Sequence, residues 1–399
     1  MSDTQKHTKP NVPNLRFPGF EGEWEHHYLS EYLDFKNGLN PSAKSFGEGI
    51  KFISVMDILN NPFISYDCIR SSVAATDKEK KEFCVEYGDI LFQRSSETLE
   101  DVGHANVYLD NRPALFGGFT IRGKKKGDYN PLFFKHLLDS PTARKKVIVK
   151  GAGAQHFNIG QEGLSTVSLS FPSLPEQNKI ATLFSLIDER IAIQNRVIED
   201  LRKLKAALCE LLYKESDPNY LIGEIIEQTS TRNRKGESLK VLSVSNQLGF
   251  IDQSEQFEGR TIASQDTSNY KVVSLDDFAY NPARINVGSI ARLKDFEKGI
   301  VSPMYVCFRC KNGILPGYLE SFFDTDYFFL EMEKRLEGSV RMCLSFEGLC
   351  NIPISIPNLQ KQKTVGHRIQ VLKDKINLEE SIFKQLSLQK QFLLSQLFI

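Results

Sequence analysis

The sequence of 399 residues has few features of a secreted or membrane protein. No apolar run approaches the roughly 20 residues that a membrane helix needs. The N-terminal stretch MSDTQKHTKPNVPN is polar and does not resemble a signal peptide. The 7 cysteines are irregularly spaced, which argues against a disulfide framework and favours a reducing cytosol. We expect a cytoplasmic protein without membrane contact, in which residues 1–13 form a flexible tail.

The chain also lacks net charge and recognisable catalytic motifs. Its 50 Lys and Arg residues balance 50 Asp and Glu residues, so any surface for a polyanion must be local. No GxxxxGK(S/T) loop is present for nucleotide hydrolysis, and the histidines lack the spacing of metal ligands. A single CxxC, from Cys307 to Cys310, has no second pair to complete a zinc site. We therefore expect no catalytic residue, bound cofactor or metal in this chain.

The sequence does contain an internal repeat. FPSLPEQNKIATLFSLIDERI (171–191) returns as IPNLQKQKTVGHRIQVLKDKI (356–376), at an offset of 185 residues. VEYGDILFQR (85–94) matches VSLDDFAYNP (273–282) at 188, and YLSEYL (28–33) matches LIGEII (221–226) at 193. This period is far longer than the roughly 20–50 residues of solenoid repeats. It predicts a duplicated unit, consisting of a globular domain followed by a long helix.

Each copy begins with short β-like runs separated by Gly, Asn and Asp turns, and it ends in a helical pattern. We therefore expect an α+β protein with two α/β domains. The predicted boundaries are 14–173 for the first globular domain, 174–214 for a central helix, 215–357 for the second globular domain and 358–399 for a final helix.

The two helical patterns are matched in length and carry apolar residues at heptad spacing, so we expect them to pack together as a coiled coil. Gln194 and Glu379 interrupt the apolar rows at the same register. They are either a solvated gap or a polar layer that fixes register. The predicted seam comprises Ile180, Leu183, Ile187, Gln194, Leu201, Leu208, Val365, Ile369, Leu372, Ile376, Leu386 and Leu393.

Three segments resemble the specificity subunits of type I restriction–modification systems: FPSLPEQNKIATLFSLIDERIAIQN (171–195), its echo SIPNLQKQKTVGHRIQVLKDKI (355–376), and GDILFQRSSETLEDVG (88–103). The second copy is more diverged, with Gln360 and Lys361 in place of the Pro-Glu of the first. The resemblance implies two target recognition domains, each of which reads half of a bipartite DNA site. It also implies that the two helices pair antiparallel as a spacer.

The resemblance further implies a set of partners. They are double-stranded DNA, two methyltransferase subunits, and restriction subunits that also act as translocases. S-adenosylmethionine, ATP and Mg would then be used by the partner subunits and not by this chain.

Polar and basic side chains on loops are the candidates for DNA contacts, because base edges and phosphates are read by such groups. Each has a structural alternative, such as a solvated hairpin tip or a tight turn. The candidates are Gln93, Arg94, Ser95, Ser96, Lys124, Lys125, Lys150, Gln155 and His156 in the first copy, and Arg232, Asn233, Arg234, Lys235, Asn281, Arg284, Asn286 and Arg341 in the second.

Two other functions remain open from the sequence. A coiled-coil scaffold without DNA binding would share the helical pattern, but it gives no reason for polar loops at matched places in both copies. An adenine methyltransferase is suggested only by YNPA (280–283), which loosely resembles the (N/D)PP(Y/F) loop that holds a flipped base. Arg284 stands where that loop has its aromatic residue, which weighs against this alternative.

Overall fold

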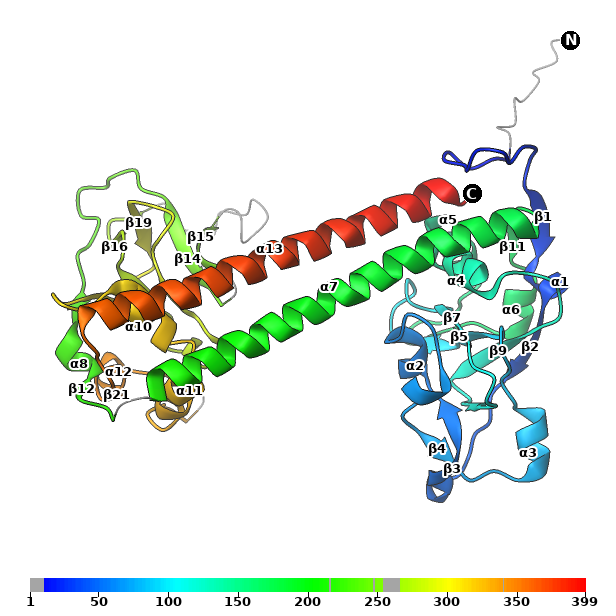
Figure 1. Cartoon of the computed structure of the whole chain (residues 1–399), viewed down its shortest axis with the longest axis horizontal. Coiled ribbons are helices and arrows are strands. Elements are labelled where there is room, and N and C mark those ends of the chain that lie inside the picture. The colour runs from blue at the N-terminus through cyan, green and yellow to red at the C-terminus, as the bar shows by residue number, and fades with distance from the viewer. Residues whose placement is uncertain (1–10, 215–216, 247, 254–265, 340) are drawn as a thin grey trace, which may run out of the picture. The chain divides into compact units, whose positions relative to one another are not determined.

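The computed structural model describes residues 11–214, 217–246, 248–253, 266–339 and 341–399 (Figure 1). The chain divides into two compact units, and each contains one copy of the repeat. Unit 1 comprises residues 1–195 and 382–399, and unit 2 comprises residues 196–381. The division falls inside both long helices, α7 (Leu174–Lys214) and α13 (Leu359–Leu397). The predicted α+β class with two long helices is confirmed.

Unit 1 is built around an antiparallel sheet with strand order β2-β9-β5-β7. A smaller sheet has the order β4-β3-β8, in which β3 and β8 run parallel. Strand β1 pairs with β11, which leads into α7. The elements are β1 (Glu25–Tyr28), α1 (Leu29–Tyr32), β2 (Leu33–Asn37), η1 (Ala43–Ser45), β3 (Phe46–Ile53), α2 (Val55–Leu59), η2 (Tyr66–Cys68), β4 (Ser72–Val73), α3 (Asp77–Glu82), β5 (Ile90–Gln93), β6 (Ser95–Ser96), β7 (Ala105–Val107), β8 (Leu115–Phe116), β9 (Thr120–Lys125), α4 (Pro131–Asp139), α5 (Pro141–Ile148), β10 (Phe157–Asn158), α6 (Gln161–Ser165) and β11 (Ser168–Phe171).

Unit 2 repeats this plan. Its main sheet has the order β13-β20-β17-β18, its second sheet contains the parallel pair β14 and β19, and β12 pairs with β21 before α13 begins. The elements are β12 (Tyr220–Leu221), α8 (Ile222–Ile225), β13 (Ile226–Thr229), β14 (Val241–Ser245), β15 (Gly249–Asp252), β16 (Lys271–Ser274), β17 (Phe278–Tyr280), η3 (Ile285–Val287), β18 (Ile290–Arg292), β19 (Lys298–Val301), β20 (Val306–Cys310), α10 (Pro316–Phe322), α11 (Asp326–Glu333), α12 (Phe346–Cys350) and β21 (Pro353–Ile354).

The start of each long helix is fixed by a buried glutamine, and the two glutamines occupy equivalent positions in the two copies. Gln177 accepts from the backbone N–H of Asn130 (3.1 Å) and donates to the carbonyl of Pro172 (2.9 Å). At the 185-residue offset, Gln362 accepts from the N–H of Leu315 (2.9 Å) and donates to Pro357 (3.0 Å). Because a buried amide must satisfy both its donor and its acceptor, each glutamine ties the helix to its own domain. The repeat predicted from the sequence is thus present in equivalent hydrogen bonds.

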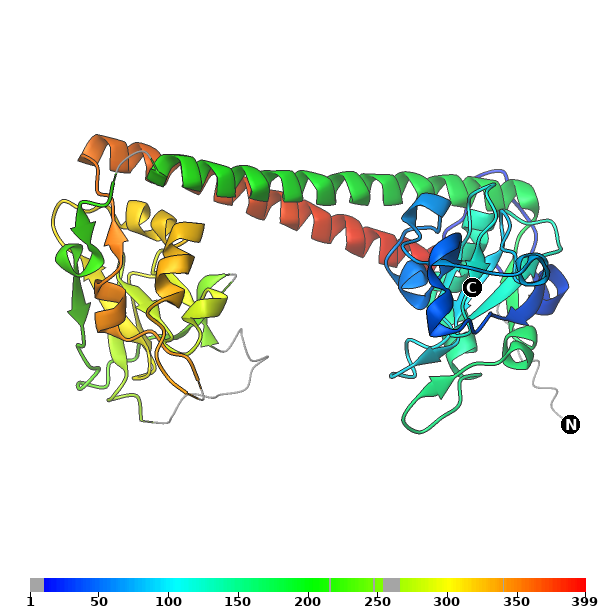
Figure 2. The ribbon, with the colours of Figure 1, turned by 90° about the horizontal axis from the view of Figure 1, so that it is seen from below.

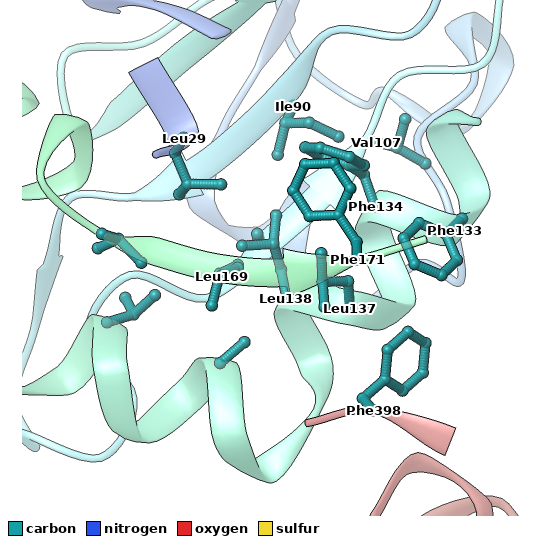
Figure 3. Close-up of a cluster of buried hydrophobic side chains, with 14 of the residues drawn as sticks. Leu29, Ile90, Val107, Phe133, Phe134, Leu137, Leu138, Leu169, Phe171 and Phe398 are labelled. Atoms are coloured by element: carbon teal, nitrogen blue, oxygen red, sulfur yellow. The ribbon is translucent and has the colours of Figure 1, made fainter. Parts of the chain in front are cut away.

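The core of unit 1 includes residues from both ends of the chain. Phe133 and Phe134 on α4 and Phe171 on β11 are buried beside the sheet residue Ile90 (Figure 3). Phe398, directly after α13, packs into the same cluster with its ring centroid 5.5 Å from that of Phe133. Burial of large aromatic side chains is among the strongest stabilising contributions in a core. The last turns of α13 are therefore attached to the first domain by hydrophobic packing.

Within each unit, the segments of α7 and α13 lie side by side (Figures 1 and 2). In unit 1, the ring of Phe184 stacks on Phe398 at 5.8 Å, and Asp188 pairs with Lys390 at 2.6 Å. As the residue number rises along α7, the number of its partner on α13 or directly after it falls, so the two segments are antiparallel. In unit 2, Arg202 of α7 pairs with Glu380 of α13 at 2.6 Å.

The predicted seam residues are all buried or half-buried, but they do not share one environment. Ile180 belongs to the core of unit 1 and Val365 to a core of unit 2, so these two pack against globular domains. Of the two residues that interrupt the apolar rows, Glu379 is buried and forms an ion pair with Lys375 on its own helix. Gln194 is half-buried. The choice between a solvated gap and a register-fixing layer stays a prediction.

Candidate nucleic-acid interface

Two predicted DNA-contacting segments of unit 1, about 60 residues apart in sequence, are brought together by the fold. Strand β6 pairs with β10, which places Ser95 opposite Asn158 and Ser96 opposite Phe157. The turn before β10 exposes Gln155 and His156. The structure therefore joins the loop after β5 and the glycine-bearing loop into one polar surface. Arg94, half-buried, and Lys150, exposed, lie on the same two segments.

The turn that carries His156 requires glycine. Gly153 has a φ of +147°, and a Cβ at this position would lie 2.0 Å from the carbonyl oxygen of His156. In unit 2, Gly338 has a φ of +126°, and its Cβ would lie 2.3 Å from the carbonyl oxygen of Arg341. Gly153 corresponds to Gly338, and His156 to Arg341, at the 185-residue offset of the repeat. Arg341 thus occupies in unit 2 the place that His156 occupies in unit 1.

The polar loop after β17 corresponds to the loop after β5. Arg284 and Asn286 are exposed on either side of Ile285, at the start of η3. The N–H of Leu344 donates to the carbonyl of Pro282, just as the N–H of Ile159 donates to that of Arg94 in unit 1. The loop after β17 is therefore held by the same contact as its counterpart.

Three of the candidate residues are buried and hydrogen-bond within their own loops. The Nε2 atom of Gln93 donates to the carbonyl of Ser95 (2.9 Å), and Oδ1 of Asn281 accepts from the N–H of Ala283 (3.1 Å). Asn233 accepts from the N–H of Glu237 and donates to its carbonyl. These amides fix loop shape. Their predicted contact with DNA stays a prediction.

The lysines at the end of β9 are half-buried and already have partners. Lys124 pairs with Glu86 at 3.2 Å, and the ammonium of Lys125 lies 4.9 Å from the ring centroid of Tyr129. Beside them, burial raises the pKa of Asp89, which accepts hydrogen bonds from the N–H groups of Glu86 and Lys125. Both lysines still present positive charge at this strand end, and their role as DNA contacts stays a prediction.

The basic loop after β13 is the most strongly charged of the candidate segments in unit 2. Arg232, Arg234 and Lys235 line a hollow of 350 Å³ together with Lys298 and Arg309. Lys298 donates to Glu237 (2.7 Å), and this hydrogen bond lowers the pKa of the Glu237 carboxyl. Lys298 and Arg309, which lie on β19 and β20, were not predicted from the sequence. Only the strand pairing brings them near a loop more than 60 residues earlier.

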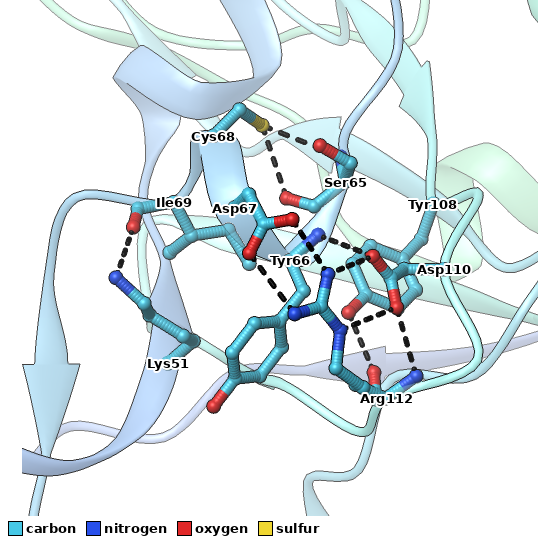
Figure 4. Close-up of polar contacts among 9 residues, drawn as sticks. All are labelled: Lys51, Ser65, Tyr66, Asp67, Cys68, Ile69, Tyr108, Asp110 and Arg112. Carbon is cyan, nitrogen blue, oxygen red and sulfur yellow. Dashed lines mark hydrogen bonds and ion pairs between the residues drawn. The ribbon is translucent and has the colours of Figure 1, made fainter.

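One conspicuous arginine in unit 1 has a structural role (Figure 4). The guanidinium of Arg112 donates to both carboxylate oxygens of Asp67 (3.0 and 2.8 Å) and to both of Asp110 (3.0 and 2.9 Å). It also stacks on Tyr66, at 4.4 Å from the ring centroid. The hydrogen bonds from Arg112 lower the pKa of Asp110. With two carboxylates as partners, Arg112 ties loops together and has little charge left for a phosphate.

The geometry gives no support to the alternative of an adenine methyltransferase. Tyr280 of the YNPA run is the last residue of β17 and is fully buried, with its hydroxyl donating to the carbonyl of Leu344 (3.2 Å).

Among the described residues, no group of His, Cys, Asp and Glu is arranged to hold a metal ion. Nor does any helix in the described part of the chain have the length and apolarity to span a membrane.

Comparisons with known proteins agree with this fold. Residues 21–203 match the family described as "Type I restriction modification DNA specificity domain". Two relatives from Methanocaldococcus jannaschii, a "Putative type I restriction enzyme MjaX specificity subunit" and a "Type I restriction enzyme MjaVIII specificity subunit", are 23% and 22% identical. Each alignment covers 94% of this chain and 92% of the relative.

Solved structures share the whole fold. The S subunit of a type I system from M. genitalium superposes with a TM-score of 0.62 at 15% identity, over 97% of this chain and 99% of that one. A chain from a structure titled "Structural basis underlying complex assembly andconformational transition of the type I R-M system" gives 0.54 at 13% identity, over 93% and 96% of the two chains. Residues 21–203 thus match the DNA specificity domain of type I restriction–modification systems, and the relatives aligned over nearly the full length extend this similarity to the specificity subunits of such systems.

Proposed function

We propose that units 1 and 2 each read one half of a bipartite site in double-stranded DNA, and that the α7–α13 pair sets the spacing between the halves. The observation that carries this proposal is the duplication, with the same sheet order and the same hydrogen bonds in both units. The equivalent loops carry different side chains, such as His156 and Arg341. Two similar scaffolds with unlike loops are suited to two different half-sites.

The experiment that tests this function is methylation mapping. The chain would be expressed with its methyltransferase partner in a host without other DNA methylation, and modified sites would be located across the genome. A split motif with an unspecified spacer is expected. A continuous motif, or methylation of the same sites without this chain, would refute the proposal.

The loop after β17 is expected to read one half-site. Replacing Arg284 and Asn286 by Ala removes exposed donors and should relax or weaken recognition of one half only, by about 10- to 100-fold per lost bidentate contact. A variant in the polar surface of unit 1, Gln155→Ala with His156→Ala, removes exposed polar side chains there and should affect the other half. Methylation mapping of both variants gives the comparison. Equal loss at both halves from either variant would contradict the division of labour.

As a specificity subunit, the chain has a non-catalytic role. We infer that S-adenosylmethionine is bound by two methyltransferase subunits, and that ATP and Mg are used by restriction subunits that translocate DNA. An exposed apolar stripe on the long helices supports the docking of such partners. Leu186, Ile193, Leu204 and Leu211 of α7 are exposed, as are Val371 and Leu378 of α13. Exposed apolar stripes of this kind mark protein–protein contact surfaces.

Negative charge introduced into this apolar stripe should prevent assembly with the methyltransferase. The change of Leu204 and Leu211 to Asp is expected to weaken methyltransferase binding at least about 100-fold, because two carboxylates would be buried unpaired in the interface. Lys203→Asp, on the same helix, is the control and should bind within about threefold of the unmodified protein. Light scattering after gel filtration of the co-expressed proteins measures the outcome. Unchanged assembly of the double variant would place the docking surface elsewhere.

A further inference from the structure

The hollow after β13 carries a surplus of positive charge in one concave place. Five cationic side chains line it, and Glu237 is its one acidic lining residue. Two of the cations are compensated, since Lys298 pairs with Glu237 (2.7 Å) and Arg309 pairs with Asp277 (3.1 Å). Arg232 donates to the neutral side chain of Asn269 (2.9 Å) and keeps its charge.

Arg234 and Lys235 are exposed, and neither has an ion-pair or hydrogen-bond partner among the residues that the structure describes. Together with Arg232 they leave about three uncompensated positive charges around one opening. Such an arrangement favours a ligand with several negative charges.

The loop that presents these charges is held in a fixed shape. Asn233, buried between Arg232 and Arg234, closes the turn through two hydrogen bonds with the backbone of Glu237 (2.9 and 3.0 Å). Its own N–H donates to the carbonyl of Tyr270 (3.0 Å). Gly236 completes the turn with a φ of +61°. A preorganised loop loses little conformational entropy when it binds.

The charged groups of the hollow offer mainly hydrogen-bond donors, and the hydroxyls of Thr231 and Ser274 can both donate and accept. The guanidinium and ammonium groups only donate, the amide of Asn233 is used by the backbone, and the Glu237 carboxylate is engaged by Lys298. Base edges present both donors and acceptors in the grooves, whereas phosphate oxygens only accept. The chemistry of the hollow therefore suits phosphates better than bases.

The matched loop of unit 1 is less basic. The loop between β2 and β3, residues 38–45, corresponds to the loop between β13 and β14, residues 230–240, and it contains a single cation, Lys44. The later loop contributes three cations to the hollow, namely Arg232, Arg234 and Lys235. The two copies of the repeat thus differ in the positive charge of one matched loop.

We propose that this basic hollow grips backbone phosphates of duplex DNA beside the half-site of unit 2, and so supplies affinity that does not depend on base sequence. The inference rests on the proposed DNA-reading function. It assigns an anchoring role to unit 2 alone and leaves base recognition to other loops of that unit, such as the one with Arg284.

The test compares salt dependence in the complex with the methyltransferase. Arg234→Gln with Lys235→Gln removes two phosphate contacts. The slope of log affinity against log salt should become shallower by about 2, with an equal fractional loss for a duplex carrying the mapped site and for a mixed-sequence duplex. Lys78→Gln with Lys81→Gln on α3 removes the same net charge from exposed positions in unit 1 and should leave the slope unchanged.

The exchange Arg234→Lys with Lys235→Arg keeps both charges and should retain the slope of the unmodified protein. An unchanged slope in the glutamine variant would overturn the phosphate grip, as would a loss confined to the cognate duplex. Failure of the unmodified complex to prefer the mapped site would instead contradict the proposed function itself.

Discussion

Insertion of one heptad into both long helices is expected to abolish methylation at sites with the native spacing. Any remaining methylation should occur at sites with the same two half-sequences and a longer spacer. A heptad adds about 10 Å of helix at about 1.5 Å per residue. At about 3.4 Å per base pair, this corresponds to about three base pairs. Matched insertions after Asn195 of α7 and after Ser381 of α13 fall at the division between the units and keep the heptad register.

The longer spacer should be a poorer substrate than the native site. Three base pairs also rotate one half-site about the DNA axis by roughly 100°, given 10–10.5 base pairs per turn. A heptad of helix rotates a following domain by only about 20°. Recovery at the new spacing is therefore expected to remain incomplete.

Methylation mapping of the insertion variant measures both quantities, namely spacer length and half-site sequence. Insertion into α7 alone is the control, because it breaks the match between the helices and should reduce methylation at every spacing. A change in the half-site sequences with an unchanged spacer would refute the idea that the helix pair acts as a ruler.

The sequence was sufficient to predict the duplication, because the repeated residues have a structural task. Gln177 and Gln362 recur at one offset since each must satisfy the same backbone groups at the start of a long helix. The heptad pattern likewise predicted the two helices. It could not show that Ile180 and Val365 face globular cores, since a partner helix and a domain surface both bury an apolar stripe.

The candidate DNA surface was less predictable. A polar residue after a strand can either project outward or close the loop. The outcome for Gln93, Asn233 and Asn281 depends on nearby backbone donors and acceptors that the sequence does not place. Lys298 and Arg309 were missed for a related reason. Their strands reach the basic loop only through sheet pairing between distant segments.

Phe398→Ala is expected to be strongly destabilising for unit 1. The side chain is 3% exposed and lies among the rings of Trp24, Phe133 and Phe184, with centroids 5.5–6.4 Å away. Truncation of such a ring leaves a cavity and costs about 3–5 kcal/mol. For a unit of this size, the loss should lower the melting temperature by roughly 10 °C. Phe398→Leu, which keeps most of the apolar volume, should cost less than about 1.5 kcal/mol.

Phe392, in the last turns of α13, provides the matched control, because its ring is 58% exposed. Phe392→Ala should change the free energy of unfolding by no more than about 0.5 kcal/mol. Since two units need not unfold together, hydrogen exchange is the sharper measurement. Amides of residues 382–397 should lose protection in Phe398→Ala, whereas those of unit 2 should not. Equal protection in the two alanine variants would mean that α13 is held to the first domain by other contacts, such as the ion pair of Lys390 with Asp188.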